Sequence, residues 1–205
     1  MTREPAPTKR QLQKEERRRQ ILSAALKVFT EKGYHAANVS DVAAEAGVSQ
    51  GTIYWYFESK EELAQAAILS VFDEWGQEAM EAILAQPTAR GRLEALFRGI
   101  ESLGEQMDGL FMLFLGYWAS SPDRAQAGQW WLDLLLEYKS IVARIIGEGV
   151  QNGEFRAVDA EALAWSLLAT YDGLAAYGML LPDLDLVRSS RAFAETVLRG
   201  LEVGS

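Results

Sequence analysis

The chain has no cysteine and a single histidine, His35, among its 205 residues. The absence of thiols excludes a disulfide framework, thiolate zinc, iron–sulfur centres and a cysteine nucleophile. No apolar run approaches the roughly 18 residues of a membrane span, and the N-terminus is basic and polar rather than that of a signal peptide. We therefore expect a soluble, cytoplasmic protein with few candidate catalytic residues, no metal and no cofactor.

The sequence also lacks the alternation of apolar and polar residues that marks a half-buried strand. Apolar residues recur at helical spacing, with glycine or proline between the runs. We predict an all-α fold with helices over residues 12–32, 38–46, 49–57, 59–85, 89–106, 109–119, 124–152, 159–180 and 186–202. The expected helix N-caps and stops are Asn38, Ser49, Ser59, Gly33, Gly47 and Gly153.

Positive charge is scarce outside the N-terminal part, and the whole chain carries a net charge of −9. Residues 1–63 hold ten basic and nine acidic side chains, whereas residues 64–205 hold ten and twenty. Seven basic side chains lie in the first nineteen residues, against three acidic ones. Salt screens charges beyond roughly 8 Å, so these local differences matter more than the total. The chain thus divides into a neutral-to-basic part and an acidic part.

Two short predicted helices are joined by Gly47–Ser49, which is the spacing of a helix-turn-helix whose second helix enters the major groove of DNA. On a wheel of about 100° per residue, Ile53 and Phe57 form the edge that is buried against the first helix. The opposite side and its flanks hold the candidate contact residues Gln50, Gly51, Thr52, Tyr54, Trp55 and Tyr56.

The alternative is that the three consecutive aromatic residues of this helix are ordinary core residues. The segment Ala46–Phe57 contains no charged residue, whereas a solvated helix normally carries acidic side chains, so a DNA-facing surface is favoured. Lys60 lies in the first turn of the next helix, where a cation is poorly placed for the helix dipole. Contact with a DNA phosphate is the better explanation for Lys60.

A run of short motifs lies between Arg18 and Leu63. The motifs are Ile21-Leu22-x-Ala24-Ala25, Phe29, Gly33-Tyr34, Asp41-Val42-Ala43, Ala46-Gly47-Val48-Ser49-x-Gly51-Thr52-Ile53-Tyr54-x-Tyr56-Phe57 and Ser59-Lys60-Glu61-x-Leu63. This stretch resembles the N-terminal domain of the TetR family of transcriptional regulators. The remainder matches the family only in pattern, as a helical, acidic, aromatic-rich body. Ala37 and Ser40 depart from the family's usual threonine and longer polar residue.

The resemblance implies a set of DNA-contact roles that agrees with the helical wheel. Asn38 would cap the supporting helix and Ser40 would face DNA. Gln50, Gly51 and Thr52 would contact bases, and Tyr54, Tyr56 and Lys60 would hold the backbone. Ser49 and Trp55 complete the candidate set.

Most aromatic residues lie beyond residue 63, where the resemblance implies a pocket for a small, largely apolar or aromatic effector. The candidate pocket residues are Trp75, Phe111, Phe114, Trp118, Trp131, Tyr138, Tyr171 and Asp172. The alternative for each aromatic residue is an ordinary place in the core. Asp172 either binds a polar or cationic ligand group or accepts a hydrogen bond from a tyrosine or serine, and the second interpretation is favoured.

The last two predicted helices carry apolar stripes that could pack into a four-helix dimer interface. The stripes are Leu163, Leu167, Leu168 and Leu174, and Phe193, Val197, Leu198 and Leu201. The alternative is that both stripes face the core of their own chain. We expect a homodimer whose two DNA-contacting helices meet a near-palindromic operator.

An enzymatic function is not expected. The run Gly47–Gly51 matches the G-x-S-x-G motif of hydrolases, but it follows a helix, and the single histidine lies upstream. We predict a ligand-responsive DNA-binding regulator, with repression as the majority mode of the family and the effector releasing DNA. The alternative is a small-molecule-binding protein with a non-functional DNA-binding part. The expected domains are a disordered basic arm (1–11), a helix-turn-helix domain (12–58) and a ligand-binding and dimerisation domain (59–205).

Overall fold

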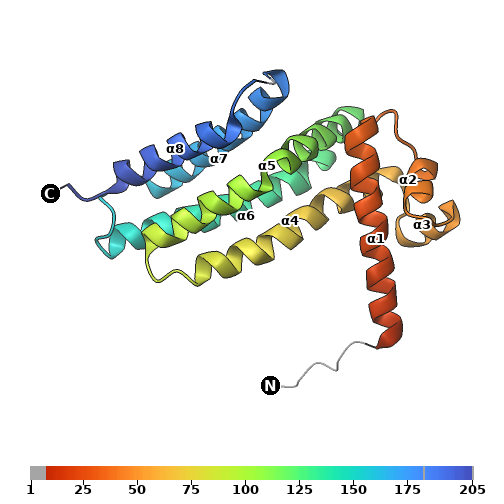
Figure 1. Ribbon diagram of the computed structural model, residues 1–205, viewed down its shortest axis with the longest axis horizontal. Coiled ribbons are helices and arrows are strands. Elements are labelled where there is room, and N and C mark those ends of the chain that lie inside the picture. Colours follow the sequence, from red (N-terminus) through yellow and green to blue (C-terminus); the bar gives the residue numbers. More distant parts are fainter. Residues whose placement is uncertain (1–7, 182, 205) are drawn as a thin grey trace. The chain divides into compact units, whose positions relative to one another are not determined.

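The computed structural model describes residues 8–181 and 183–204, except for the side chains of residues 103–108 and 179. Its helices (Figure 1) are α1 (Lys9–Lys32), α2 (Val39–Glu45), α3 (Gln50–Tyr56), α4 (Lys60–Leu84), α5 (Ala89–Ser120), α6 (Arg124–Gln151), α7 (Ala160–Leu180) and α8 (Leu186–Leu201). Among the described residues, the β-structure consists of one isolated antiparallel bridge between Phe155 and Glu202. The predicted all-α fold is confirmed.

Local sequence sets the limits of α2 and α3. The Asn38 side chain accepts a hydrogen bond of 2.9 Å from the Asp41 backbone N–H, and the Asp41 carboxylate accepts one of 3.0 Å from the Asn38 N–H. This reciprocal capping satisfies two N–H groups that the helix leaves unpaired. Ser49 caps α3 by accepting from Thr52 N–H at 3.1 Å. Gly47 joins the two helices with a φ of 62°, where a side chain would be strained.

Helix α1 begins earlier than the sequence predicted. Thr8 is its N-cap, and its N–H donates to the Gln11 side chain at 2.7 Å while the Gln11 N–H donates to the Thr8 hydroxyl at 3.3 Å. This capping box starts the helix at Lys9, so residues 9–11 are helical rather than part of a disordered arm. The rest of the predicted arm, residues 1–7, lies outside the described residues.

Helix α5 is continuous, whereas two helices were expected over 89–106 and 109–119. Gly104 and Gly109 lie on either side of the predicted break. A glycine inside a helix costs only about 1 kcal/mol relative to alanine, and the apolar run that follows offsets this by burying Leu110, Leu113 and Phe114. Burial therefore overrides the local signal.

The chain divides into two compact units. The first comprises residues up to Phe72 together with Met112–Ser120, and the second comprises Asp73–Phe111 and Ser121–Ser205. The first unit thus holds α1–α3, the first half of α4 and the last turns of α5. Its core includes Ile21, Phe29 and Val42.

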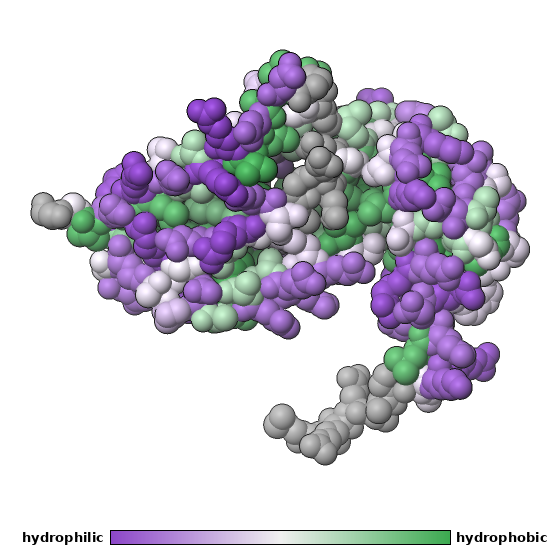
Figure 2. Space-filling view, viewed as in Figure 1, coloured by the Kyte–Doolittle hydropathy of each residue, from purple (hydrophilic) through white to green (hydrophobic). Residues whose placement is uncertain are grey.

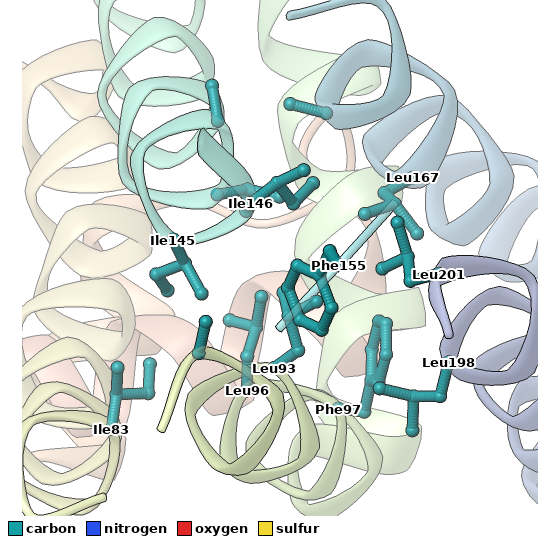
Figure 3. Packing of buried hydrophobic residues seen from close by; sticks show 14 of the residues in the cluster. Ile83, Leu93, Leu96, Phe97, Ile145, Ile146, Phe155, Leu167, Leu198 and Leu201 are labelled. Atoms are coloured by element: carbon teal, nitrogen blue, oxygen red, sulfur yellow. The ribbon is translucent and has the colours of Figure 1, made fainter. Parts of the chain in front are cut away.

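The core of the second unit is built from α4–α8 and the connection between α6 and α7 (Figure 3). Phe155, from that connection, is 4% exposed and lies among Leu93, Leu167 and Leu201. The end of the chain is tied to this core by backbone and ionic contacts. The Arg156 N–H donates to the Leu201 carbonyl at 3.0 Å.

An ion pair also joins the first turn of α5 to the residue that follows α8. Arg90, in the first turn of α5, pairs with Glu202 at 2.8 Å and with Glu94 at 3.0 Å. The Arg90 backbone N–H donates to Glu154 at 3.3 Å. No helix in the described residues is long and apolar enough to cross a membrane.

Candidate functional site

Helix α3 has one buried edge and one exposed face, as the helical wheel predicted. Ile53 and Phe57 are 1% and 2% exposed, whereas Tyr54 and Trp55 are 54% and 67% exposed. The interpretation of Tyr54 and Trp55 as core residues is therefore wrong. Gln50 and Gly51 are also exposed, and Thr52 is half-buried. The exposed face of α3 carries no carboxylate that would repel a polyanion.

Two of the predicted contact residues have local structural partners. Ser40, exposed on α2, donates its hydroxyl hydrogen to Asn38 Oδ1, the same atom that caps α2. At the start of α3, the hydroxyls of Ser49 and Thr52 share a hydrogen bond of 2.9 Å. These bonds fix the two helix N-termini and hold the Thr52 side chain in one orientation.

Tyr56 points toward α1. Its hydroxyl donates to the Lys14 backbone carbonyl at 3.3 Å, so a phosphate contact by Tyr56, which stays a prediction, requires this bond to open. Its ring packs edge-on against Trp55, with ring centroids 4.7 Å apart. The Lys14 ammonium lies 5.0 Å from the Trp55 ring centroid. Helix α3 is thus joined to the N-terminal half of α1.

A groove of about 920 Å³ lies between these two helices. We call it the α1–α3 groove. Its lining residues are Arg10, Gln13, Lys14, Glu16, Arg17, Gln20, Ser49, Gly51, Thr52, Trp55 and Tyr56. The sequence reasoning identified the α3 wall and noted the basic N-terminus, but it assigned no α1 residue to the site. The spacing of Arg10, Lys14 and Arg17 at i, i+4 and i+7, which places them on one helix face, was the available signal.

Lys60 begins α4 and lies over an aromatic ring. Its ammonium is 4.3 Å from the ring centroid of Tyr34, which is a cation–π geometry. Partial burial lowers the pKa of Lys60, although the nearby Glu61 opposes this. The Tyr34 hydroxyl donates to Glu61 at 3.1 Å, and burial followed by that carboxylate raises the pKa of Tyr34. Lys60 therefore has a defined position near α3, half-buried and cationic.

The end of α5 packs against the same tyrosine within the first unit. Tyr117 meets the Tyr34 ring edge-on at 5.9 Å. A Cβ atom on Gly116 would lie only 3.1 Å from the Tyr34 Cβ. The Ser120 hydroxyl lies 3.1 Å from His35 Nε2. The lone histidine, which is exposed and follows α1, thus contacts the end of α5.

In the second unit, two of the predicted pocket residues lie together. The Trp75 and Tyr138 rings are 5.6 Å apart, and the Trp75 indole N–H donates to the Gly99 carbonyl at 3.0 Å. Burial, followed by Glu137 and Asp73, raises the pKa of Tyr138 to about 12. The pair is a half-buried aromatic surface formed by α4 and α6, backed by α5.

Tyr171 lies at a second place in this unit, between Phe97 at 6.3 Å and Phe193 at 5.9 Å. It lines a groove of about 320 Å³ formed by α5, α7 and α8. The rim of this groove carries the ion pair between Glu101 and Arg191. Of the residues that line this groove, the sequence predicted only Tyr171 as a pocket residue, because the proximity of the others depends on tertiary packing.

Asp172 is half-buried beside Tyr171 in α7. Burial raises the pKa of its carboxyl. Among the described residues the carboxylate has no hydrogen-bond or ion-pair partner, so the favoured bond from a tyrosine or serine is not found. A hydrogen-bond donor or cation brought by a ligand would stabilise this desolvated, unpaired carboxylate.

The other predicted pocket residues are divided between the units. Trp131 is buried in the second unit, where it contacts Trp130 edge-on at 5.7 Å, and Phe111 is half-buried there. Phe114 and Trp118 belong to the first unit, with 8% and 38% of their surface exposed. The structure therefore does not bring the eight residues together within one unit.

The apolar stripes predicted for dimerisation mostly face the core of their own chain. Leu167, Leu198 and Leu201 are buried, and Leu163, Leu168, Phe193 and Val197 pack against the same core cluster. Leu174 is half-buried. Among the side chains of α7 that the structure describes, the large apolar ones that are exposed are instead Trp165, Tyr177 and Leu180. The burial pattern therefore supports the alternative interpretation, in which both stripes face the core of their own chain.

Comparison with known proteins matches both halves of the chain to families. Residues 21–67 match the family described as bacterial regulatory proteins, tetR family. Residues 89–201, more than half of the chain, match the family described as BetI-type transcriptional repressor, C-terminal. The fatty acid metabolism regulator protein of Bacillus subtilis is 28% identical over 192 residues, which cover 92% of this chain and 97% of the relative.

Two solved structures are similar over nearly the whole chain. The transcriptional regulator FadR from Bacillus subtilis, in complex with stearoyl-CoA, has a TM-score of 0.74 and 28% identity, covering 90% of this chain and 99% of its own. A putative regulator from Saccharomonospora viridis, in complex with choline, has a TM-score of 0.79 and 24% identity, covering 93% and 100%. With its helix-turn-helix and its C-terminal helical domain, this chain belongs to the TetR family of DNA-binding transcriptional regulators.

Proposed function

We propose that the protein is a homodimeric repressor that binds operator DNA through α2 and α3 and releases it when a small molecule binds the C-terminal helical domain. The observation that carries the DNA-binding part is the exposed, uncharged face of α3, held in place by its Ser49 cap. A short helix that buries one edge and exposes polar and aromatic residues on the other has the form of a major-groove reader.

We assign roles along this face from exposure and position. Gln50 and Thr52, at the start of α3, contact base edges, and Gly51 permits a close approach of the backbone. Tyr54 and Lys60 contact phosphates on either side of the groove. Lys60 leaves the Tyr34 ring to do so. The N-termini of α2 and α3 are held toward the DNA by Asn38, Ser40 and Ser49. Trp55 and Tyr56 hold α3 in place through their contacts with Lys14 of α1.

The dimer is proposed to form through α7 and α8. Trp165, Tyr177 and Leu180 are 43%, 58% and 73% exposed on α7. Exposed apolar residues gathered along one helix mark an interaction site, and an isologous contact between two copies would cover them. Dimerisation places two copies of α3 on successive major grooves, about 34–36 Å apart.

The effector is proposed to be small and largely apolar or aromatic. Support comes from the Trp75–Tyr138 pair and from Tyr171 with its groove. The relative FadR, crystallised with stearoyl-CoA, carries a ligand with a long apolar chain. Asp172, half-buried beside Tyr171, offers a polar anchor. To move the protein from mostly DNA-competent to mostly released, the effector needs about 5.5 kcal/mol of preference for one state.

Fluorescence anisotropy with a duplex from immediately upstream of the protein's own gene tests the proposal, with a scrambled duplex as control. We expect tighter binding to the upstream duplex, in steps of one dimer. Selection from random duplexes then defines the operator if this region lacks one. Failure to select any preferred sequence would refute operator binding and leave the alternative of a ligand-binding protein with a non-functional DNA-binding part.

A further inference from the structure

The N-terminal half of α1 carries three cations on one face. Arg10, Lys14 and Arg17 lie within about 60° on the helical wheel, since each residue advances by about 100°. All three are exposed and line the α1–α3 groove. Figure 2 shows mainly hydrophilic residues along this half of α1 on the visible face. We call these residues the α1 stripe.

The cations of the α1 stripe are not neutralised by the protein. Within the described part of the chain none of the three forms an ion pair, and the Arg17 guanidinium donates only to the neutral Gln20 side chain, at 2.9 Å. Glu16, the one acidic residue lining the groove, is paired with Arg19 at 2.8 Å. The groove wall therefore presents positive charge that lacks a counter-charge from the chain itself.

Contacts with α3 hold the stripe beside the exposed face. The Tyr56 hydroxyl bonds the Lys14 carbonyl, and the Lys14 ammonium lies over the exposed Trp55 ring. Trp55 is therefore placed to orient Lys14 rather than to pack in the core. A cation over an aromatic face keeps its charge and its N–H donors available to an anion on the other side.

We propose that the α1 stripe is a second DNA-contact element, which binds phosphates of the backbone strand that borders the groove contacted by α3, with Trp55 as a positioning residue for Lys14. The inference rests on the proposed function, because it requires α3 to lie on DNA. From residue 10 to residue 17 the helix rises about 10 Å. One DNA strand carries a phosphate every ~3.4 Å of duplex axis, so separate cations can meet separate phosphates.

The test is the salt dependence of DNA binding by the full chain. Each phosphate contact contributes about 0.9 to the slope of log K against log salt concentration. The variant Lys14→Ala/Arg17→Ala removes two cations from each protomer, so the slope for a dimer should fall by about 3.6. Both positions are exposed, and alanine favours the helix, so the fold should be retained. Far-ultraviolet circular dichroism checks this.

The matched control is Arg124→Ala/Arg144→Ala, which removes the same charge from exposed residues of α6 in the second unit, outside the proposed dimer interface. We expect the control to leave the slope unchanged. The α1 variant should lose affinity equally for the operator and for the scrambled duplex, because phosphate contacts carry no sequence information. If the slope is unchanged in the α1 variant while the wild-type protein still prefers the operator, the role of the α1 stripe is refuted and the proposed function stands. Absence of any preference in the wild-type protein would overturn the proposed function.

A double-mutant cycle tests the role of Trp55. If the ring orients Lys14, then Lys14→Ala should reduce affinity much less in a Trp55→Ala background than in the wild type. Trp55→Phe should restore most of the Lys14 effect, since it keeps an aromatic face. Equal effects of Lys14→Ala in both backgrounds would refute the positioning role.

Discussion

Replacing either of two glycines in α6, Gly147 or Gly149, by alanine should change the stability of the protein in opposite directions. A Cβ on Gly149 would lie 2.2 Å from Phe155 Cδ2 and 2.9 Å from the Ala89 Cβ. Phe155 cannot easily withdraw, because it is buried and its backbone N–H donates to the Gly149 carbonyl at 3.0 Å. A Cβ on Gly147, two residues earlier, would meet nothing within 4 Å.

The free energies follow from these distances. Overpacking costs typically 1–3 kcal/mol, and the double clash at Gly149 places Gly149→Ala at about 3 kcal/mol. The gain in helix propensity, about 1 kcal/mol, leaves a net loss of about 2 kcal/mol. Gly147→Ala receives the same gain without a clash. At about 2–4 °C per kcal/mol, the Tm should fall by about 4–8 °C for Gly149→Ala and rise by about 2–4 °C for Gly147→Ala.

Thermal unfolding followed by circular dichroism measures both shifts. The protein concentration must be the same for each variant, because association changes the apparent stability. A Gly149→Ala variant as stable as Gly147→Ala would show that Phe155 is not packed against α6 as described, and would refute the reasoning.

Three further predictions concern the proposed sites. Lys60→Ala should weaken binding to specific and scrambled duplexes alike and lower the salt slope by about 0.9 for each phosphate that Lys60 binds, measured by anisotropy across salt; an unchanged slope contradicts the assignment. Thr52→Ala should instead reduce discrimination between the two duplexes by roughly 1–3 kcal/mol, and an equal loss on both would assign Thr52 to the backbone. Asp172→Asn should remove a pH dependence of stability. Burial raises the pKa of Asp172 in the folded state, so the wild type loses stability as the pH rises through that pKa. Denaturant unfolding should show that the stability of the variant rises relative to that of the wild type as the pH increases from about 4, the ordinary pKa of an aspartate carboxyl, and parallel curves would contradict this.

Features that depend on a few neighbouring residues could be predicted from the sequence. The caps at Asn38 and Ser49 were found because a short polar side chain and the next turn of helix suffice to define them. The buried edge of α3 was found because Ile53 and Phe57 are one turn apart. The start of α1 was missed since the capping box at Thr8 follows a segment whose prolines suggested disorder.

Features that depend on tertiary packing could not be predicted. The stripe containing Leu167 and Leu198 is apolar whether it faces its own core or a second chain, so periodicity cannot decide between them. Nothing in the sequence indicates that the Asp172 carboxylate lacks a hydrogen-bond or ion-pair partner among the described residues. The α1–α3 groove requires the position of Trp55 against Lys14, two residues far apart in the chain.

The ion pair between Arg90 and Glu202 determines how late in synthesis the second unit can finish folding. The two residues are 112 positions apart, and the Arg156–Leu201 bond closes the same end of the second unit. On the ribosome, helices α5 to α7 are complete while this end is still open, because Leu201 and Glu202 are synthesised after them. Contacts of such high sequence separation form late and slowly. Folding of the second unit is therefore expected to finish only after Leu201 and Glu202 have left the exit tunnel.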